Sequence, residues 1–265
     1  MNLKLEHPVA LVPTMGALHA GHESLIKIAK TEAKSIVVSI FVNPLQFENT
    51  NDFSNYPKSI EADTKLAESS GATFVWVPTF DEIYPSEPTI ISAGEIGNLF
   101  EGVHRFGHFD GVLTVVKRLF DLANPQFAVF GEKDFQQLFL IKEMVKKLEL
   151  PIKIISAPTI RDSSGLAMSS RNIRLSVSDR ESAIGIYRAL ELANTATTLE
   201  LARTKLKSAV STIPNFLPDY AELIDENTFD LATATTTNVR AIVAGWINGV
   251  RLIDNMVMSK IGVSK

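Results

Sequence analysis

The sequence predicts an α/β protein with an open parallel sheet in residues 1–160 and a smaller α+β domain in residues 161–265. Two observations predict this fold. In the first part, five short apolar runs alternate with segments of helical spacing, which is the pattern of a parallel sheet with crossover helices. After Asn172, two helical patterns come first and the candidate strands follow, which is typical of a separate α+β domain.

The first predicted strand, Val9–Val12, leads through a glycine-containing turn into a segment with apolar residues at helical spacing. In a parallel sheet such a turn can bind phosphate, because the first N–H groups of the helix are unpaired and its dipole is positive at that end. His19 and His22 lie three residues apart in this turn, with Gly21 between them to allow close approach of a ligand. The turn is therefore a candidate phosphate site.

Two other roles stay open for these histidines. They could be structural residues, or His19 and His22 could share a helical face as metal ligands. A metal site here would lack ligands, because the chain has no cysteine and no further histidine lies nearby in the sequence. The turn alone does not distinguish among the three roles.

The second predicted strand is Ser35–Val42, an apolar run rich in β-branched residues, as in a strand buried on both faces. Pro44 ends this strand and favours an extended backbone at Asn43. Asn43 and Gln46 would then lie at the carboxyl edge of the sheet, where ligands of open α/β sheets bind. A plain turn is the alternative for this segment.

The next part of the chain is predicted to continue the alternation. Residues 49–57 are polar and indicate a loop, and residues 59–69 have helical spacing and end before Gly71. The acidic side chains of this helix are more typical of a solvated face than of metal ligands. A third strand is predicted over residues 73–77, and residues 78–97 are predicted to form a loop with at most a short strand.

Residues 99–111 differ in composition from their surroundings, with three glycines, His104, Arg105 and His108 directly before a segment with an apolar helical stripe. Charged and aromatic side chains on a glycine-rich loop at a helix start suit an anionic ligand. The alternative is a surface loop with incidental histidines.

The fourth predicted strand, Phe127–Phe130, passes directly into a helix through a turn that carries Lys133. Gly131 permits the tight turn, and Lys133 adds a cation where the helix end already favours anions. Asp134 is predicted to cap the helix. Gln137 lies one turn further along, near enough to face the same space.

A fifth strand is predicted over residues 152–156, followed by a polar segment over residues 161–172. Ser169, Ser170 and Arg171 in this segment could surround a polyphosphate with hydroxyl donors and a charge-assisted guanidinium fork. A plain interdomain linker is the alternative, and it explains the serines better than it explains the run that ends in Arg171.

The remaining residues predict helices over 180–193 and 199–211 and candidate strands over 219–225 and 241–244. We expect this small α+β domain to cover the ligand edge of the sheet.

The net charge of −4 argues against nucleic acid as the main partner. Because the chain has no cysteine and no apolar run of the length that spans a bilayer, we expect a cytoplasmic protein without a membrane partner.

Five motifs follow one another along the chain, and Arg251-Leu-Ile-Asp-Asn255 continues the series. They are Pro13-Thr-Met-Gly-x-Leu-His-x-Gly-His22, Phe41-Val-Asn-Pro-x-Gln-Phe47, His108-Phe-x-Gly-Val112, Phe130-Gly-Glu-Lys-Asp-x-Gln-Gln137 and Gly165-Leu-Ala-Met-Ser-Ser-Arg-Asn172. Together they closely resemble the motifs of the pantothenate synthetase family, also called pantoate–β-alanine ligases. The resemblance covers nearly the whole chain and implies a Rossmann-like nucleotidyltransferase domain with a smaller α+β C-terminal lid domain.

The resemblance implies an AMP-forming ligase that condenses (R)-pantoate with β-alanine through a pantoyl-adenylate, with ATP and Mg²⁺, to give the coenzyme A precursor pantothenate. His22 would be the proton donor, with His19, Lys133 and Arg171 as the other catalytic residues. The implied ATP site comprises Met15, Gly16, Ala17, Leu18, His19, Ala20, Gly21, His22, Gly131, Glu132, Lys133, Asp134, Ile160, Met168, Ser169, Ser170 and Arg171.

The implied pantoate site comprises Gln46, Gln137, Asn43, Arg105 and His108, with Gln46 also facing β-alanine. Asp63 would contact the metal indirectly, through another group. The family resemblance also implies a homodimer. Family members usually have a strand and a helix ahead of the first motif, whereas about a dozen residues precede it here, so we expect one edge element of the sheet to be missing.

Three other functions stay open at this point. A different adenylyl- or cytidylyltransferase would share the first and last motifs but would not need both Gln46 and Gln137. A tRNA-charging enzyme would need an additional anticodon-reading part, for which no residues remain. A non-catalytic nucleotide-binding module would have no need to combine His22, Lys133 and Arg171.

Overall fold

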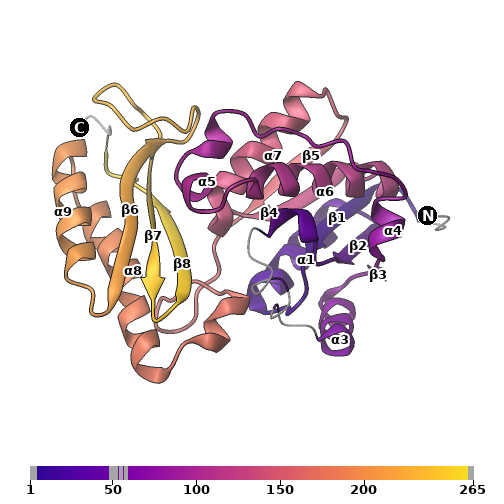
Figure 1. Ribbon diagram of the computed structural model, residues 1–265, viewed down its shortest axis with the longest axis horizontal. Helices are drawn as coiled ribbons and strands as arrows, with labels where there is room; N and C mark the ends of the chain where they lie inside the picture. The colour runs from indigo at the N-terminus through magenta and orange to yellow at the C-terminus, as the bar shows by residue number, and fades with distance from the viewer. Residues whose placement is uncertain (1–4, 48–52, 54–55, 57–58, 262–265) are drawn as a thin grey trace. The chain divides into compact units, whose positions relative to one another are not determined.

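The computed structural model describes residues 5–47, 53, 56 and 59–261 of the chain. It divides into two compact units, Met1–Thr159 and Ile160–Lys265, shown in Figure 1. Most of the loop predicted over residues 49–57 lies outside the described residues. In the described part of the chain, no helix is both long and apolar enough to cross a membrane.

The first unit contains a five-stranded parallel sheet, which confirms all five predicted strands. The strand order is β3-β2-β1-β4-β5, so the chain moves outward from β1 in one direction and then from β4 in the other. The strands are β1 Val9–Thr14, β2 Ser35–Ile40, β3 Phe74–Trp76, β4 Phe127–Gly131 and β5 Lys153–Ala157. This reversal between β1 and β4 is the position where open α/β sheets bind ligands at their carboxyl edge.

Helices cover both faces of this sheet. Alternate side chains of each strand point to opposite faces, and both sets are apolar in the central strands, so each face packs against helices. Ala10 and Val12 of β1 belong to a core with residues of α1 and α3, whereas Val9 and Leu11 belong to a core with residues of α6 and α7. The four helices are α1 Ala20–Glu32, α3 Ile60–Ser70, α6 His108–Ala123 and α7 Phe135–Lys147 (Figure 1). Burial on both faces explains why the central strands β1, β2 and β4 read as continuous apolar runs.

Two predicted loops of the first unit contain short helices, so those predictions were partly wrong. Residues 78–97 include α4 Phe80–Ile83, and residues 99–111 include α5 Glu101–His104 and the first turn of α6. A helix of four residues is too short to show a hydrophobic period. The single-turn 3₁₀ helices of this unit are η1 Pro44–Gln46, η2 Ile96–Asn98 and η3 Glu132–Asp134.

The second unit is an α+β domain, as predicted, with an antiparallel sheet in the order β6-β7-β8. Apolar residues of the sheet form one core with residues of α8 and α9. The sequence did not predict β8, which follows β7 through a tight turn at Asn248 and Gly249 with φ angles of +43° and +77°. The elements are η4 Ser170–Arg174, α8 Val177–Asn194, α9 Leu199–Ser211, β6 Phe216–Asp225, β7 Val239–Ile247 and β8 Val250–Val257.

Candidate active site

The first unit brings the first and fourth motifs to the carboxyl ends of the two central strands. The first motif connects β1 to α1, and residues 131–134 connect β4 to α7. Lys133 and Asp134 both act electrostatically on the imidazoles of His19 and His22, so the two turns face the same space. This space lies at the reversal of the strand order, where a nucleotide is expected.

His19 and His22 form a reciprocal cap at the start of α1. The Gly21 N–H donates to Nδ1 of His19 at 3.1 Å, and the His19 N–H donates to Nδ1 of His22 at 3.3 Å. The arrangement is a capping box in which imidazoles replace the usual hydroxyl and carboxylate. Because Nδ1 of His22 accepts a hydrogen bond, the proton of its neutral ring lies on Nε2.

Both imidazoles are neutral at pH 7 in this structure. The pKa of His22 is lowered to about 3, mainly by burial and secondly by the neighbouring His19. Burial also lowers the pKa of His19 to about 4, with the charge of Lys133 as the second cause. His22 therefore presents a neutral Nε2–H, which can donate a hydrogen bond to charge that develops on an oxygen.

The lowered pKa of His22 predicts a stability that falls on acidification. Between about pH 6.5 and pH 3 the unfolded chain binds more protons than the folded chain, so the free energy of unfolding falls as the pH falls through this range. Between pH 7 and pH 5 we expect a loss of about 1–2 kcal/mol from this group. Urea unfolding at both pH values measures this difference in the free energy of unfolding. The difference should be smaller in His22→Gln, because glutamine does not titrate. Equal pH differences in the two proteins would contradict the prediction.

Asp63, in the first turn of α3, holds the turn between β1 and α1. Its Oδ2 accepts the Ala17 N–H and its Oδ1 accepts the Leu18 N–H, both at 2.8 Å, and the Ser59 hydroxyl donates to Oδ1 at 3.0 Å. The side chain is buried. The metal contact that the resemblance implies for Asp63 stays a prediction; in the structure its carboxylate oxygens accept hydrogen bonds from the backbone of the turn. In the described ranges, no group of three or more His, Cys, Asp or Glu side chains could hold a metal ion.

The backbone of this turn already satisfies much of its own hydrogen bonding. Gly16 and Ala17 have φ angles of +89° and +51°, and a Cβ at Gly16 would lie 3.1 Å from Oδ2 of Asp63. The Gly16 N–H donates to Oγ1 of Thr14 at 3.3 Å. The first N–H groups of the helix were expected to be unpaired, but that of Gly21 donates to His19, and the N–H groups of residues 16–19 ahead of the helix also have protein acceptors. A phosphate bound at this turn would therefore need donors from side chains and from the other N–H groups of the first helical turn.

The second motif forms a buried amide cluster at the end of β2. Asn43 Nδ2 donates to the Gly111 carbonyl at 3.0 Å, and Gln46 Nε2 contacts the Met15 sulfur at 2.9 Å. His108 lies at the start of α6 and not in a loop, and its Nδ1–H donates to the Gln46 carbonyl at 2.8 Å. All three polar side chains are buried, at 1–6% exposure. The structure therefore places Asn43, Gln46 and His108 together, next to the first motif.

A close helix approach holds this cluster in place. A Cβ at Gly111 would lie 2.3 Å from the carbonyl oxygen of Leu45, so α6 can meet η1 only because this residue has no side chain. The Tyr84 hydroxyl donates to Oδ1 of Asn43 at 3.3 Å. The sequence reasoning did not identify these contacts as part of the site.

Gln137 and Arg105 come from neighbouring segments of the same unit. Gln137 is partly buried in the first turn of α7, and the Arg105 carbonyl accepts the His108 N–H at 3.1 Å. The adjacent Gln136, which the sequence did not single out, is buried and binds the backbone of Glu101, Ile96 and Leu99. Of the two adjacent glutamines, Gln136 therefore has a structural role, and Gln137 is the more accessible.

The last motif lies on one loop of the second unit. The Ile160 carbonyl accepts the Met168 N–H at 2.9 Å, and the Ser169 hydroxyl caps η4 by accepting the Arg171 N–H at 3.3 Å. Asn172 is buried and donates from Nδ2 to the Ala167 carbonyl at 2.9 Å. Backbone and side-chain hydrogen bonds thus define the path of residues 167–172.

Comparisons with known proteins agree with the motifs. The family model of pantoate-beta-alanine ligase matches residues 2–257. Pantothenate synthetase of Acidothermus cellulolyticus is 47% identical over 97% of this chain and 87% of its own length. The pantoate--beta-alanine ligase of Schizosaccharomyces pombe is 42% identical over 94% of this chain and 90% of its own length.

Solved structures give the same result. The crystal structure of pantothenate synthetase from Thermus thermophilus has a TM-score of 0.90 at 39% identity and covers 95% of this chain and 93% of its own. The Francisella tularensis pantoate-beta-alanine ligase was solved in complex with beta-gamma ATP and β-alanine. Its structure has a TM-score of 0.78 at 39% identity, and the match covers 95% of this chain and 90% of the Francisella chain. A family match over nearly the whole chain, with relatives above 40% identity, shows that this chain belongs to the pantoate–β-alanine ligase family, whose members make pantothenate.

Proposed function

We propose that this ligase activates pantoate with ATP, forming pantoyl-adenylate and pyrophosphate, and that β-alanine then displaces AMP to give pantothenate. One observation carries this proposal: the two turns that bear His22 and Lys133 meet at the carboxyl ends of β1 and β4, beside the buried amide cluster at Gln46. The Francisella tularensis ligase was solved with beta-gamma ATP and β-alanine bound, which supports the same pair of substrates here.

In the first step, a pantoate carboxylate oxygen bonds to the α-phosphorus of ATP, and the bond to the pyrophosphate oxygen breaks. This reaction needs alignment of the reactants and neutralisation of the leaving pyrophosphate. Lys133 would supply a positive charge, and the Nε2–H of His22 would donate to an oxygen on which charge develops. Ser169, Ser170 and Arg171 would be further donors to the phosphates, as the family resemblance implies.

In the second step, the β-alanine amine bonds to the acyl carbon of pantoyl-adenylate, AMP leaves, and the amine loses a proton. Gln46 would contact both pantoate and β-alanine, with Gln137 as the other amide of the pantoate site. Asn43 and His108 bind the Gly111 and Gln46 carbonyls, so they would act mainly by holding η1 in position.

Magnesium would enter this site with the triphosphate. The described residues offer no carboxylate cluster for a metal held by the protein, and Asp63 binds the backbone of the turn. Mg²⁺ in nucleotide sites usually binds substrate phosphates and keeps several waters, so few protein ligands are needed.

The homodimer expected from the family stays a prediction that light scattering can test.

Product analysis tests the proposed reaction. We expect AMP as the only nucleotide product, together with pyrophosphate, and both should form from ATP only when pantoate is present, because the adenylate requires the pantoate carboxylate. Chromatography of reactions from which pantoate or β-alanine is omitted in turn measures this. ADP and phosphate as products would contradict the adenylate and indicate an acyl-phosphate intermediate.

Two adjacent glutamines provide a test of the pantoate site. Gln137→Ala should weaken pantoate use, by the roughly 1–3 kcal/mol of a lost hydrogen bond to a buried polar ligand, with ATP affinity and Tm nearly unchanged. Gln136→Ala removes three hydrogen bonds to backbone groups and should lower Tm. Pantoate KM, calorimetric ATP affinity and Tm measured on both variants separate these effects. A collapse of ATP affinity in Gln137→Ala would exclude the assignment.

A further inference from the structure

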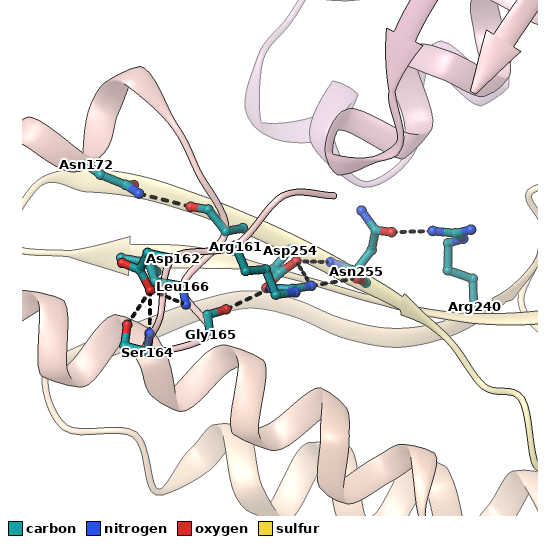
Figure 2. A network of polar contacts seen from close by, with 10 residues as sticks. Arg161, Asp162, Ser164, Gly165, Leu166, Asn172, Arg240, Asp254 and Asn255 are labelled. Carbon is teal, nitrogen blue, oxygen red and sulfur yellow. Dashed lines mark hydrogen bonds and ion pairs between the residues drawn. The ribbon is translucent and has the colours of Figure 1, made fainter. Parts of the chain in front are cut away.

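Arg161 is the centre of a partly buried polar network in the second unit, shown in Figure 2. Its two terminal nitrogens donate to the two carboxylate oxygens of Asp254, at 2.5 and 2.9 Å. The guanidinium also lies over the ring of Tyr187, 4.4 Å from the ring centroid. The side chains of Arg161 and Asp254 are 16% and 6% exposed. A bidentate pair with a stacked ring fixes the orientation of a guanidinium more tightly than a single contact would.

The same arginine also holds its own loop. Its Nη1 donates to the Gly165 carbonyl at 3.1 Å, and its backbone pairs with Ala167 in an antiparallel bridge. Gly165 has a φ angle of +95°, and a Cβ there would lie 2.3 Å from the Tyr187 ring. The loop therefore closes against the ring on which the guanidinium stacks.

A second set of hydrogen bonds closes the turn between Arg161 and the last motif. Asp162 Oδ1 accepts the N–H groups of Ser164 and Leu166 at 2.9 and 3.1 Å (Figure 2). Directly after the bridge to Ala167, the Met168 N–H donates to the Ile160 carbonyl at 2.9 Å. The start of residues 168–171 is thus held against the backbone that carries Arg161.

Hydrogen bonds and ion pairs of the sheet surround Asp254 at the other end of the network. Asp254 lies on β8, and the neighbouring Asn255 accepts a hydrogen bond from Arg240 of β7 at 2.5 Å. Arg240 also pairs with Glu226 at 2.5 Å. Asp254 is therefore fixed in a hydrogen-bonded sheet, and the loop is attached to this sheet through Arg161.

We propose that Arg161 is a positioning residue, which with Asp254 holds residues 168–171 in the geometry needed to bind the ATP phosphates. The inference rests on the proposed ATP role of these residues. A buried ion pair is weak support for a role in stability alone, because desolvation offsets much of its Coulomb energy. The pair instead fixes a position: it links the backbone of Arg161, next to residues 168–171, to Asp254 on β8.

The test uses Arg161→Lys, which keeps the charge but loses the fork, and Asp254→Asn, which keeps the shape but loses the charge. Arg203→Lys is the matched control, because Arg203 in α9 also pairs with a carboxylate, that of Glu200, and donates to a backbone carbonyl. Pantoate-dependent adenylate formation, KM for ATP and for pantoate, Tm, and hydrogen exchange of a peptide covering residues 166–172 are measured on each full-length protein.

We expect Arg161→Lys and Asp254→Asn to lower adenylate formation per folded molecule by about tenfold or more, because small misplacements of binding groups cost this much. KM for ATP should rise, KM for pantoate should stay within about twofold, and residues 166–172 should exchange faster. Arg203→Lys should resemble the parent protein. Lower Tm with normal ATP kinetics and normal exchange would overturn the proposal. If the parent protein formed no AMP, the proposed function would fail, and hydrogen exchange alone would still decide whether Arg161 orders the loop.

Discussion

His22→Ala is expected to lower the rate of pantoyl-adenylate formation by on the order of 10²-fold or more, with only a modest change in ATP affinity. The Nε2–H of His22 would meet charge that develops as pyrophosphate leaves, so its contribution arises mainly in the transition state. Single-turnover adenylation and calorimetric ATP binding measure the two quantities.

His22 also caps α1, so the alanine variant should lose stability as well, by about 1 kcal/mol. His22→Gln is the control, because a glutamine at this position can still accept the His19 N–H as in an ordinary capping box. It should recover most of the lost Tm but not the lost rate. A His22→Ala protein that is destabilised but fully active per folded molecule would remove this residue from the mechanism.

Lys133→Met is expected to lower kcat/KM for ATP by roughly 10²-fold or more and to weaken ATP binding as well. Lys133 lies in η3 at the end of β4, and its side chain is 20% exposed, so its charge would face the triphosphate in both the ground state and the transition state. Steady-state kinetics and calorimetric ATP titration measure both effects, and the loss of ATP affinity should distinguish Lys133→Met from His22→Ala.

Lys146→Met is a suitable control, because Lys146 lies at the far end of α7 and its side chain is 79% exposed. It should have nearly normal activity and ATP affinity. Unchanged ATP affinity in Lys133→Met would show that Lys133 does not contact the bound nucleotide before reaction.

The sequence predicted the parallel sheet because its central strands are buried on both faces and so form uninterrupted apolar runs, as in Ser35–Val42. It missed β8, although Asn248-Gly249 between two apolar segments is a strong signal for a hairpin. The short helices α4 and α5 could not be predicted from periodicity, because four residues do not define a helical face.

The positions of the candidate site residues in the fold were predictable where motifs follow strand ends. The sequence could place His19, His22 and Lys133 at turns after strands, but it could not show that Asp63 binds N–H groups 45 and 46 residues earlier in the chain. Such pairing depends on how α3 packs, which local patterns do not describe. The bond between Arg161 and Asp254 spans 93 residues and was missed for the same reason.

The histidine capping box has a consequence for engineering. Serine, aspartate or asparagine at position 19 and glutamate at position 22 are the residues that stabilise a helix start best, so a design method that optimises stability would choose them. Such changes would gain on the order of 1 kcal/mol and remove both imidazoles. The proposed roles of His19 and His22 therefore predict that selection for heat resistance and selection for turnover favour different residues at the start of α1. Substitutions that raise thermal stability without loss of activity are then expected elsewhere in the chain.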